Sequence, residues 1–276
     1  MSSFLNEIAR SSLERVAKAR SLESQDVLWQ RASEAPAAPA LQLSAAGFDV
    51  IAELKLRSPA AGVLRTASED VCARVGAYAE GGASAVSVLT EPYHFDGSMA
   101  HLARASETLA PRGVPTMRKD FIIDPYQVME ARAVGAGGIL VILRMLDHGR
   151  IVALLDCAAM LHMFVLMEAF DEGDLAVARQ IVGERAGRRE HLLVGVNARD
   201  LDTLQVVPGR LEELAAKLPE GVPHVAESGI SSAEDAAQLA RAGYQLVLVG
   251  SALMADDEPQ ALLRAMLEGG RAAAKR

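Results

Sequence analysis

The feature that most constrains the fold is a regular alternation of short apolar runs with longer helical patterns. From residue 48 onward, eight runs rich in Val, Ile, Leu and Ala begin at intervals of about 23 to 35 residues, the length of a strand, a loop and a covering helix. We expect strands over residues 49–54, 84–89, 114–118, 137–142, 163–168, 192–197, 223–227 and 246–250. Helical patterns separate them, over residues 68–81, 99–109, 125–134, 151–161, 171–186, 211–218 and 233–242.

Eight such units predict an α/β protein with a single (β/α)8 TIM barrel rather than an open sheet. No G-x-G-x-x-G follows the first strand, so the pattern gives little support to a dinucleotide-binding fold. We expect the catalytic barrel to occupy residues 48–276. Residues 1–47 are expected to form an N-terminal helical extension that caps the barrel. Apolar residues recur there at roughly helical intervals from Leu5 to Val16, and a Pro- and Ala-rich linker follows at 35–40.

The composition argues against several classes of protein. Half of the residues are hydrophobic, and the formal net charge of −8 argues against general nucleic-acid binding. The longest apolar runs are strand-sized, so no membrane partner is expected, and the first residues lack the basic and apolar regions of a secretion signal. Cys72 and Cys157 are too few for a disulfide framework and fit a reducing compartment. We therefore expect a cytoplasmic protein. The sequence does not determine the oligomeric state, for which we expect a monomer or a weak homodimer.

Ionisable side chains stand at the ends of several apolar strands. Glu53 and Lys55 are two residues apart in the first strand and therefore face the same side. Burying charge in a core is expensive unless it is matched. The same pattern recurs at Lys119, Glu168, Asn197 and Glu227. Because the C-terminal ends of the strands form the active-site face of such a barrel, these residues predict an active site there.

Each of these charges also has a plain structural interpretation. Glu53 and Lys55 could form an ion pair at the barrel rim instead of an acid–base pair. Lys119 could be a solvated loop lysine, although alternation along its strand makes it a candidate for the top of the barrel. Glu168 could accept hydrogen bonds from a neighbouring loop instead of acting as a base.

Neighbouring residues suggest how the site is completed. Arg199 and Asp200, after the sixth strand, are expected to brace their loop as a salt bridge. Phe121, close to Lys119, could supply an apolar wall for an aromatic ring. The six histidines form no ligand-spaced pair, and we expect no metal site.

Small residues follow the last two expected strands. Ser228 and Gly229 come after the seventh strand, and Gly250 and Ser251 after the eighth. Such residues let backbone N–H groups approach a phosphate, and a following helix N-terminus adds partial positive charge. This is the usual phosphate-binding position of these barrels, so we expect a phosphorylated small-molecule substrate.

Five segments, in this order and at this spacing, resemble the indole-3-glycerol phosphate synthase family, and the resemblance extends from Val50 to Met254. The segments are residues 51–55 (IAELK, with Ser58 and Pro59 after it), 95–98 (FDGS), 118–127 (RKDFIIDPYQ), 195–201 (GVNARDL) and 226–230 (AESGI). The resemblance implies a substrate with an anthranilate ring, an opened deoxyribulose chain and a terminal phosphate. It implies closure of the pyrrole ring with release of carbon dioxide and water, and no metal or organic cofactor.

The resemblance also implies a role for each matching residue. Lys119 matches the lysine proposed to protonate the substrate carbonyl oxygen. Lys55 matches one that holds the substrate carboxylate and is also a candidate acid. Glu168 matches a base or cation-stabilising carboxylate, and Glu53 a carboxylate used in the dehydration. The remaining matches bind substrate: Asn197 and Glu227 position it, Arg199 lies near the anthranilate end, and Ser58, Gly229, Gly250 and Ser251 cradle the phosphate. We hypothesise that burial lowers the pKa of Lys119.

The sequence leaves three alternative functions. Ala60 and Ala198 stand where the family commonly has other residues, which leaves room for a paralogue that acts on a modified anthranilate. Another phosphosugar barrel, such as an isomerase, would need a Cys or Asp residue as part of an acid–base pair in its active site. Cys72 and Cys157 fall in expected helices, which argues against this alternative. A non-catalytic phosphosugar-binding barrel would need the phosphate cradle but not four converging charges.

Overall fold

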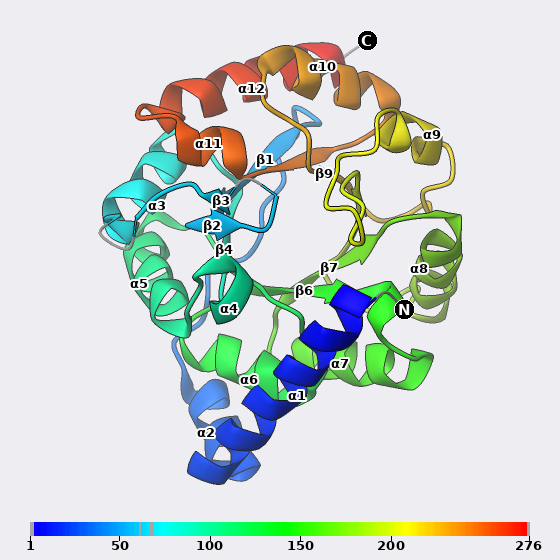
Figure 1. Ribbon diagram of the computed structural model, residues 1–276. Helices are drawn as coiled ribbons and strands as arrows, with labels where there is room; N and C mark the ends of the chain where they lie inside the picture. Colours follow the sequence, from blue (N-terminus) through cyan, green and yellow to red (C-terminus); the bar gives the residue numbers. More distant parts are fainter. Residues whose placement is uncertain (1–2, 61, 67–68, 275–276) are drawn as a thin grey trace.

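The computed structural model describes residues 3–60, 62–66 and 69–274 and contains a closed barrel of eight parallel strands (Figure 1). The strands are β1 (Asp49–Leu54), β4 (Ala85–Leu89), β5 (Thr116–Lys119), β6 (Gly138–Ile142), β7 (Phe164–Ala169), β8 (Leu192–Asn197), β9 (His224–Glu227) and β10 (Leu246–Val249). Their order is β1-β10-β9-β8-β7-β6-β5-β4, and β4 pairs with β1 to close the ring. The predicted (β/α)8 TIM barrel is confirmed, with strand bounds close to those expected.

Helices cover the outside of the barrel. They are α3 (Val71–Glu80), α5 (Met99–Leu109), α6 (Pro125–Ala133), α7 (His148–Met160), α8 (Glu172–Glu184), α9 (Arg210–Ala215), α10 (Ala233–Ala242) and α12 (Pro259–Ala274). Most of them begin after an Asp or Ser whose side chain accepts a backbone N–H of the first turn. Such a cap at Asp147 starts α7 three residues before the expected position. The expected start of α3, residue 68, lies outside the described residues.

Shorter elements lie between the main strands and helices. They are the two-stranded sheet of β2 (Arg57–Ser58) and β3 (Gly62–Val63), the helices α4 (Pro92–Phe95) and α11 (Ser251–Ala255), and the 3-10 helices η1 (Ala110–Arg112) and η2 (Leu143–Met145). β2, β3, α4 and α11 follow the C-terminal ends of β1, β4 and β10, so they surround the mouth of the barrel.

Side chains alternate between two apolar cores along each strand. Inward-facing residues fill the barrel: Ile51, Ala85, Met117, Leu140, Leu166, Leu193, Val225 and Leu246. Outward-facing residues such as Val50, Val86 and Val194 pack against the helices. Both faces of the sheet are therefore buried, which explains why the strands read as nearly continuous apolar runs. Toward the C-terminal ends of the strands, the inward-facing positions change from apolar residues to Glu53, Lys119, Glu168 and Glu227, which line the mouth of the barrel.

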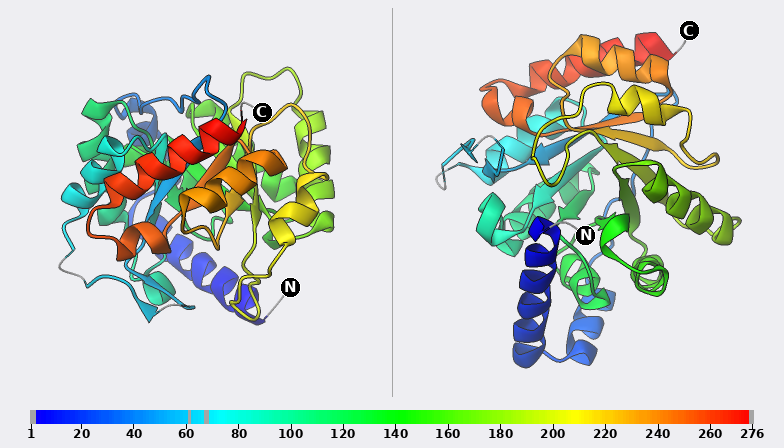
Figure 2. Two further views of the ribbon diagram at one scale, coloured as in Figure 1. Left: turned by 90° about the horizontal axis from the view of Figure 1, so that it is seen from above. Right: turned by 45° about the vertical axis from the view of Figure 1, so that its right-hand side comes forward.

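Two further helices, α1 (Ser3–Leu22) and α2 (Gln25–Glu34), precede β1 and lie side by side at one edge of the barrel (Figures 1 and 2). In the left view of Figure 2, α1 lies at the same end of the barrel as the β2–β3 hairpin and the loop after β8. Ser12 of α1 donates a hydrogen bond to the carbonyl oxygen of Phe121, and Arg15 binds the carboxylate of Asp120. The α1 helix is thus joined to the loop that follows β5. Among the described helices, none is long and apolar enough to cross a membrane.

Candidate active site

A cavity of about 470 Å³ opens at the C-terminal ends of the barrel strands. It brings together every residue that the sequence predicted for the site: Glu53, Lys55, Ser58, Lys119, Phe121, Glu168, Asn197, Arg199, Glu227, Ser228, Gly229, Gly250 and Ser251. These residues come from six strands and the loops after them, so only closure of the barrel makes them neighbours. Within the described ranges, no group of three or more His, Cys, Asp or Glu side chains is placed to hold a metal ion.

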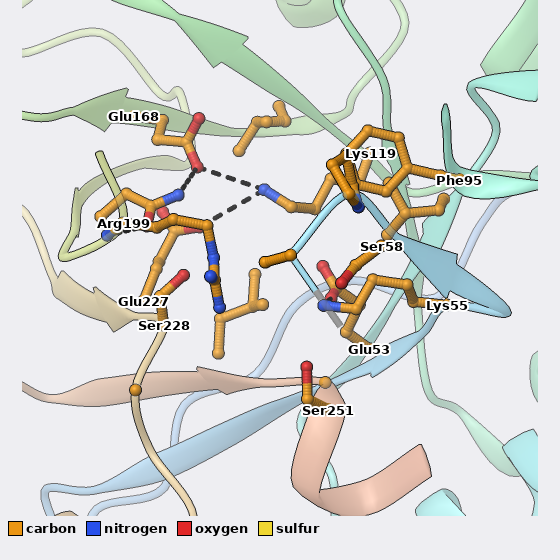
Figure 3. Close-up of a pocket in the computed structure, with 18 of the residues that line it drawn as sticks. Glu53, Lys55, Ser58, Phe95, Lys119, Glu168, Arg199, Glu227, Ser228 and Ser251 are labelled. Atoms are coloured by element: carbon orange, nitrogen blue, oxygen red, sulfur yellow. Dashed lines mark hydrogen bonds and ion pairs between the residues drawn. The ribbon is translucent and has the colours of Figure 1, made fainter. Parts of the chain in front are cut away.

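Lys119 is the centre of an ionic cluster on one side of the cavity (Figure 3). Its Nζ lies 3.2 Å from Glu168 Oε1 and 3.5 Å from Glu227 Oε2. Asn197 Nδ2 donates a hydrogen bond of 2.9 Å to the same oxygen of Glu168. The side chains of Glu168 and Glu227 are only 3% and 1% exposed, so their charges are poorly screened by water.

Burial and charge act in opposite directions on the protonation of this cluster. Burial alone would lower the pKa of Lys119, but the negative charges of Glu168 and Glu227 outweigh it and raise the pKa above its ordinary value. Our hypothesis of a lowered pKa for Lys119 is therefore wrong, because two carboxylates face the ammonium at short range. Burial raises the pKa of Glu227 well above its ordinary value, and the negative charge of Glu168 adds to the effect. Lys119 is thus held as an ammonium beside a carboxyl group that favours its protonated form.

A second ion pair faces the same cavity from β1. Glu53 Oε1 lies 2.7 Å from Lys55 Nζ, and both side chains are largely buried. The two residues point the same way because they are two apart in an extended segment, as expected. Glu53 also lies close enough to raise the pKa of Lys119, so the two ion pairs share one electrostatic environment.

Behind Lys119, a buried polar network holds the loop after β5. Asp120 accepts hydrogen bonds from Thr90 Oγ1 at 2.7 Å, from Arg118 at 3.0 Å and from two nitrogens of Arg15 at 2.8 and 2.9 Å. It also accepts the N–H of Phe121. The sequence indicated Arg118 and Asp120 only as motif residues. Arg15 lies 105 residues earlier in the chain than Asp120, and nothing local predicts that the two side chains meet.

The loop after β8 places Arg199 at the cavity, but Arg199 does not pair with Asp200 as expected. Arg199 Nη1 donates to the carbonyl oxygen of Leu204, whereas Asp200 lies 3.7 Å from Arg210. The predicted Arg199–Asp200 salt bridge is therefore wrong. Asp200 still braces its own loop, because it accepts the N–H groups of Asp202 and Thr203. Successive residues on an extended chain point apart, which separates the two charges and directs Arg199 into the cavity.

The cavity lining differs in chemistry from place to place. Ser228 and Gly229 adopt left-handed backbone conformations with φ of 72° and 78°, and Gly250 and Ser251 open α11 after the adjacent strand. This tight turn of small residues leaves backbone and hydroxyl groups facing the cavity. Elsewhere in the cavity, the rings of Phe95 and Phe121 approach within 6.3 Å between centroids.

Sequence reasoning missed part of the apolar lining. Phe95 lies in a segment that was recognised as a motif, but no role was predicted for it. Leu201 and Leu204, from the loop after β8, also line the cavity. A loop leucine has no regular periodicity, so it gives no signal of which way it points. Phe95 could have been found from its place in the FDGS motif.

Comparisons with known proteins identify the family of the chain. The sequence model of a family described as indole-3-glycerol phosphate synthase matches residues 5–266. Similar proteins carrying that name occur in Parafrankia sp. (42% identity over 228 residues, 83% of this chain and 81% of the relative) and Salinibacter ruber (40% over 241 residues, 87% and 85%). One from Streptomyces griseus is 37% identical over 270 residues, 97% of this chain and 96% of the relative.

Solved structures support the fold alone. A 3-hexulose-6-phosphate synthase from Salmonella typhimurium superposes with a TM-score of 0.63 at 14% identity and covers 82% of this chain and 100% of its own. A thiamine phosphate pyrophosphorylase from Pyrococcus furiosus gives 0.57 at 13% identity, with coverage of 82% and 97%. The family model and the curated relatives each span most of the chain. The protein therefore belongs to the indole-3-glycerol phosphate synthase family.

Proposed function

We propose that the protein converts 1-(2-carboxyphenylamino)-1-deoxyribulose 5-phosphate into indole-3-glycerol phosphate, with release of carbon dioxide and water, in tryptophan biosynthesis. The observation that carries this proposal is the convergence of two buried ion pairs on one cavity. Lys119 with Glu168 and Glu227, and Lys55 with Glu53, line one cavity together with a turn of small residues and a pair of aromatic rings. A mere phosphosugar-binding protein would gain nothing from burying these charges at such cost.

Ring closure requires a proton at the carbonyl oxygen. The ring carbon that bears the carboxylate attacks the ketone carbon, a C–C bond forms, and negative charge develops on the carbonyl oxygen. Lys119 is positioned to donate its proton to that oxygen, and its raised pKa keeps it protonated at neutral pH. Glu168, which faces Lys119, stabilises the positive charge that remains on the substrate nitrogen, and Glu227 helps to position the substrate.

Loss of carbon dioxide and water completes the reaction. When the C–C bond to the carboxylate breaks, its electron pair returns to the ring system and restores aromaticity. Lys55 holds the carboxylate until that step. The hydroxyl then leaves as water after one proton is delivered to its oxygen, and a second proton is removed from the neighbouring carbon. Glu53, held 2.7 Å from Lys55, serves this dehydration.

The remaining lining residues orient the substrate along the cavity. Ser58, Gly229, Gly250 and Ser251 receive the phosphate, with the N–H groups at the start of α11 directed to it. Phe95 and Phe121 pack against the anthranilate ring, and Arg199 reaches the substrate from the loop after β8. Asn197 holds Glu168 in place through its amide.

We further propose that residues 48–276 form the catalytic barrel and that residues 1–47 cap its mouth. The bonds from Ser12 and Arg15 to the loop after β5 support the cap. The two cysteines are free, which fits a cytoplasmic location, and the net charge of −8 fits a protein that binds no nucleic acid. A monomer or a weak homodimer would suffice, because one chain supplies every proposed catalytic residue.

One assay tests the proposed function. The purified protein is mixed with the carboxyphenylamino substrate, and the fluorescence of the indole product is followed. We expect Lys119→Met to lose at least about 1,000-fold in kcat, because the general acid is removed, while substrate affinity measured by equilibrium binding changes little. Lys217→Met, which removes a surface lysine paired with Glu172, is the matched control.

Three results would count against this assignment. Turnover close to that of the unsubstituted protein in Lys119→Met would refute the role of Lys119. Binding without turnover by the unsubstituted protein would favour the non-catalytic barrel. Faster turnover of a ring-substituted substrate than of the unsubstituted one would favour the paralogue that acts on a modified anthranilate.

A further inference from the structure

Two glycines lie in the barrel wall directly beside the two least hydrogen-bonded carboxylates of the site. Resting on the proposed function, we propose that Gly195 and Gly250 are positioning residues. Gly195 lies in β8 and Gly250 directly follows β10, and each leaves a notch into which the carboxyl group of the neighbouring strand fits. Gly195 seats Glu227, and Gly250 seats Glu53. The space left by the missing side chains helps to determine where these two carboxyl groups lie.

The register of β7, β8 and β9 places Gly195 between two acids. Gly195 pairs with Glu168 on one side, and Asn197 of the same strand pairs with Glu227 on the other. Leu193 and Asn197 both face the interior, so alternation directs position 195 inward as well. Any side chain at 195 would therefore enter the space between Glu168 and Glu227.

That space is occupied by Glu227 itself. A Cβ atom placed on Gly195 would overlap Glu227 Oε1, and it would lie 3.3 Å from Glu227 Cδ and 3.1 Å from a methyl group of Leu166. The overlapping atom is the end of a flexible side chain and not part of the backbone. An added methyl group would therefore move the carboxylate and leave β8 in place.

Few directional contacts hold Glu227 where it is. Neither of its carboxyl oxygens accepts a hydrogen bond from the described residues, although both are buried. Lys119 lies 3.5 Å away, which is longer than a hydrogen bond, and Glu168 can share a hydrogen bond with Glu227 only when Glu227 is protonated. A group with so few directional bonds takes much of its position from the shape of the wall around it. The notch at Gly195 therefore helps to set the distance between Glu227 and Lys119.

The same arrangement recurs on the other side of the barrel. β10 pairs with β1 so that Val249 is opposite Ala52, which brings Gly250 beside Glu53. A Cβ atom on Gly250 would overlap Glu53 Oε1, and it would lie 3.1 Å from both Glu53 Cδ and Lys55 Nζ. Gly250 has a negative φ of −120°, which alanine also adopts, so backbone conformation does not require glycine here. Glycine is required at this position because the Glu53–Lys55 pair approaches the backbone so closely.

Gly195 gives the cleaner test, because Gly250 also belongs to the proposed phosphate cradle. We expect Gly195→Ala to lower kcat on the order of 100-fold, as a displaced catalytic group does, with a small change in Tm. Gly138→Ala is the matched control. Gly138 is an inward-facing glycine of β6 whose Cβ would meet the ring of Phe164 and no carboxylate. We expect that variant to lose stability but keep kcat and its pH profile.

A double-substitution cycle separates displacement of Glu227 from general damage. Glu227→Asp shortens the acid by one methylene, so its carboxylate no longer fills the notch. When Gly195→Ala is added to the Glu227→Asp variant, we expect it to lower kcat by much less than 100-fold. An equal cost in both backgrounds, or a Gly195→Ala variant with unchanged kcat, would overturn the proposal.

A measurement independent of turnover distinguishes this inference from the proposed function. The carboxyl carbon of Glu227 is followed by NMR in protein labelled with 13C-glutamate and is identified by its loss in Glu227→Gln. We expect Gly195→Ala to move the titration midpoint of this signal, because its distances to Lys119 and Glu168 change. An unchanged midpoint overturns the inference even if the protein is active. A moved midpoint supports it even if the unsubstituted protein fails the activity assay.

Discussion

At the scale of single residues, the site has to attract an anionic substrate although four carboxyl groups line its cavity, those of Glu53, Asp120, Glu168 and Glu227. Asp120 is matched by Arg118 and Arg15, which bind it from behind the cavity. The other three share the cavity with the cations Lys55, Lys119 and Arg199. The raised pKa of Glu227 reduces the negative charge that these three place on the cavity, which eases the approach of an anion to a chain whose net charge is −8.

Asp120 yields a prediction about stability and pH. Burial alone would raise the pKa of Asp120, but Arg118 and Arg15 outweigh it and hold the pKa below its ordinary value. Because the unfolded carboxyl has a pKa near 3.9, the ionised group stabilises the fold above about pH 4, and this stabilisation is lost as the pH falls through the folded pKa. We expect Asp120→Asn to lower the free energy of unfolding by about 3–5 kcal/mol at pH 7 in urea titrations, because two guanidinium groups lose their counter-charge.

The pH dependence provides the check on this prediction. The difference between Asp120→Asn and the unsubstituted protein should narrow as the pH falls from about 4 toward the folded pKa of Asp120, because the unfolded carboxyl takes up a proton before the folded one does. Asp257→Asn, which disrupts an exposed ion pair with Arg65, should change stability little at any pH. A constant difference across the acid range would show that Asp120 acts through packing and not through its charge.

At the scale of elements, the strands carry the side chains of the site, and the helices pack against the outside of the strands and hold them in place. The last helix, α12, packs closely on α10 and beside β1. Gly270 of α12 lies against Phe48, a fully buried side chain immediately before β1. A glycine at this helix position lets the two elements approach, although glycine weakens a helix by itself. Close packing of α12 has therefore outweighed helix propensity at this residue.

This packing predicts opposite effects for two alanine substitutions. A Cβ atom on Gly270 would overlap the ring of Phe48, so we expect Gly270→Ala to lower the free energy of unfolding by about 1–3 kcal/mol. Gly183 lies in α8 with nothing within 4 Å of an added Cβ. We therefore expect Gly183→Ala to raise the free energy of unfolding by about 0.5–1 kcal/mol. Urea titrations measure both. Stability equal to the unsubstituted protein in Gly270→Ala would mean that α12 can shift away from Phe48 at little cost.

At the scale of the whole molecule, the N-terminal helices and the barrel are joined by buried contacts. Leu28 and Ala32 of α2 are fully buried, and α2 packs against α6. Arg132 of α6 donates hydrogen bonds to the carbonyl oxygens of Ala35 and Pro36, in the linker after α2. With the Arg15–Asp120 ion pair, these contacts connect residues 3–36 to the barrel at several points. The two parts are therefore expected to unfold as one unit.

The single tryptophan makes cooperative unfolding measurable. Trp29 lies in α2, so its fluorescence reports on the N-terminal helices, whereas far-UV circular dichroism reports mainly on the barrel. We expect the two signals to change at the same urea concentration, with the same midpoint and slope. A fluorescence transition at clearly lower urea would show that the N-terminal helices detach first. Such a result would contradict a firmly joined cap.

The sequence by itself determined the features that depend on local periodicity. Apolar runs at regular intervals located the eight strands, and alternation along them placed Glu53, Lys119, Glu168 and Glu227 on the inner face of the barrel. The position of these residues at the C-terminal ends of their strands placed them at the mouth. Small residues after the last two strands marked the turns that line another part of the same cavity. These properties follow from the geometry of a single strand and of the turn after it, so they can be predicted before the partner strands are known.

Only the tertiary structure decided how these groups act on one another. The bond between Arg15 and Asp120, the notch that Gly195 provides for Glu227, and the direction of the pKa shift of Lys119 each depend on residues far apart in the chain. They are set by strand register, by barrel closure and by the docking of α1. A change of about 1 Å in such distances between buried charges alters their interaction strongly, and local sequence does not encode those distances.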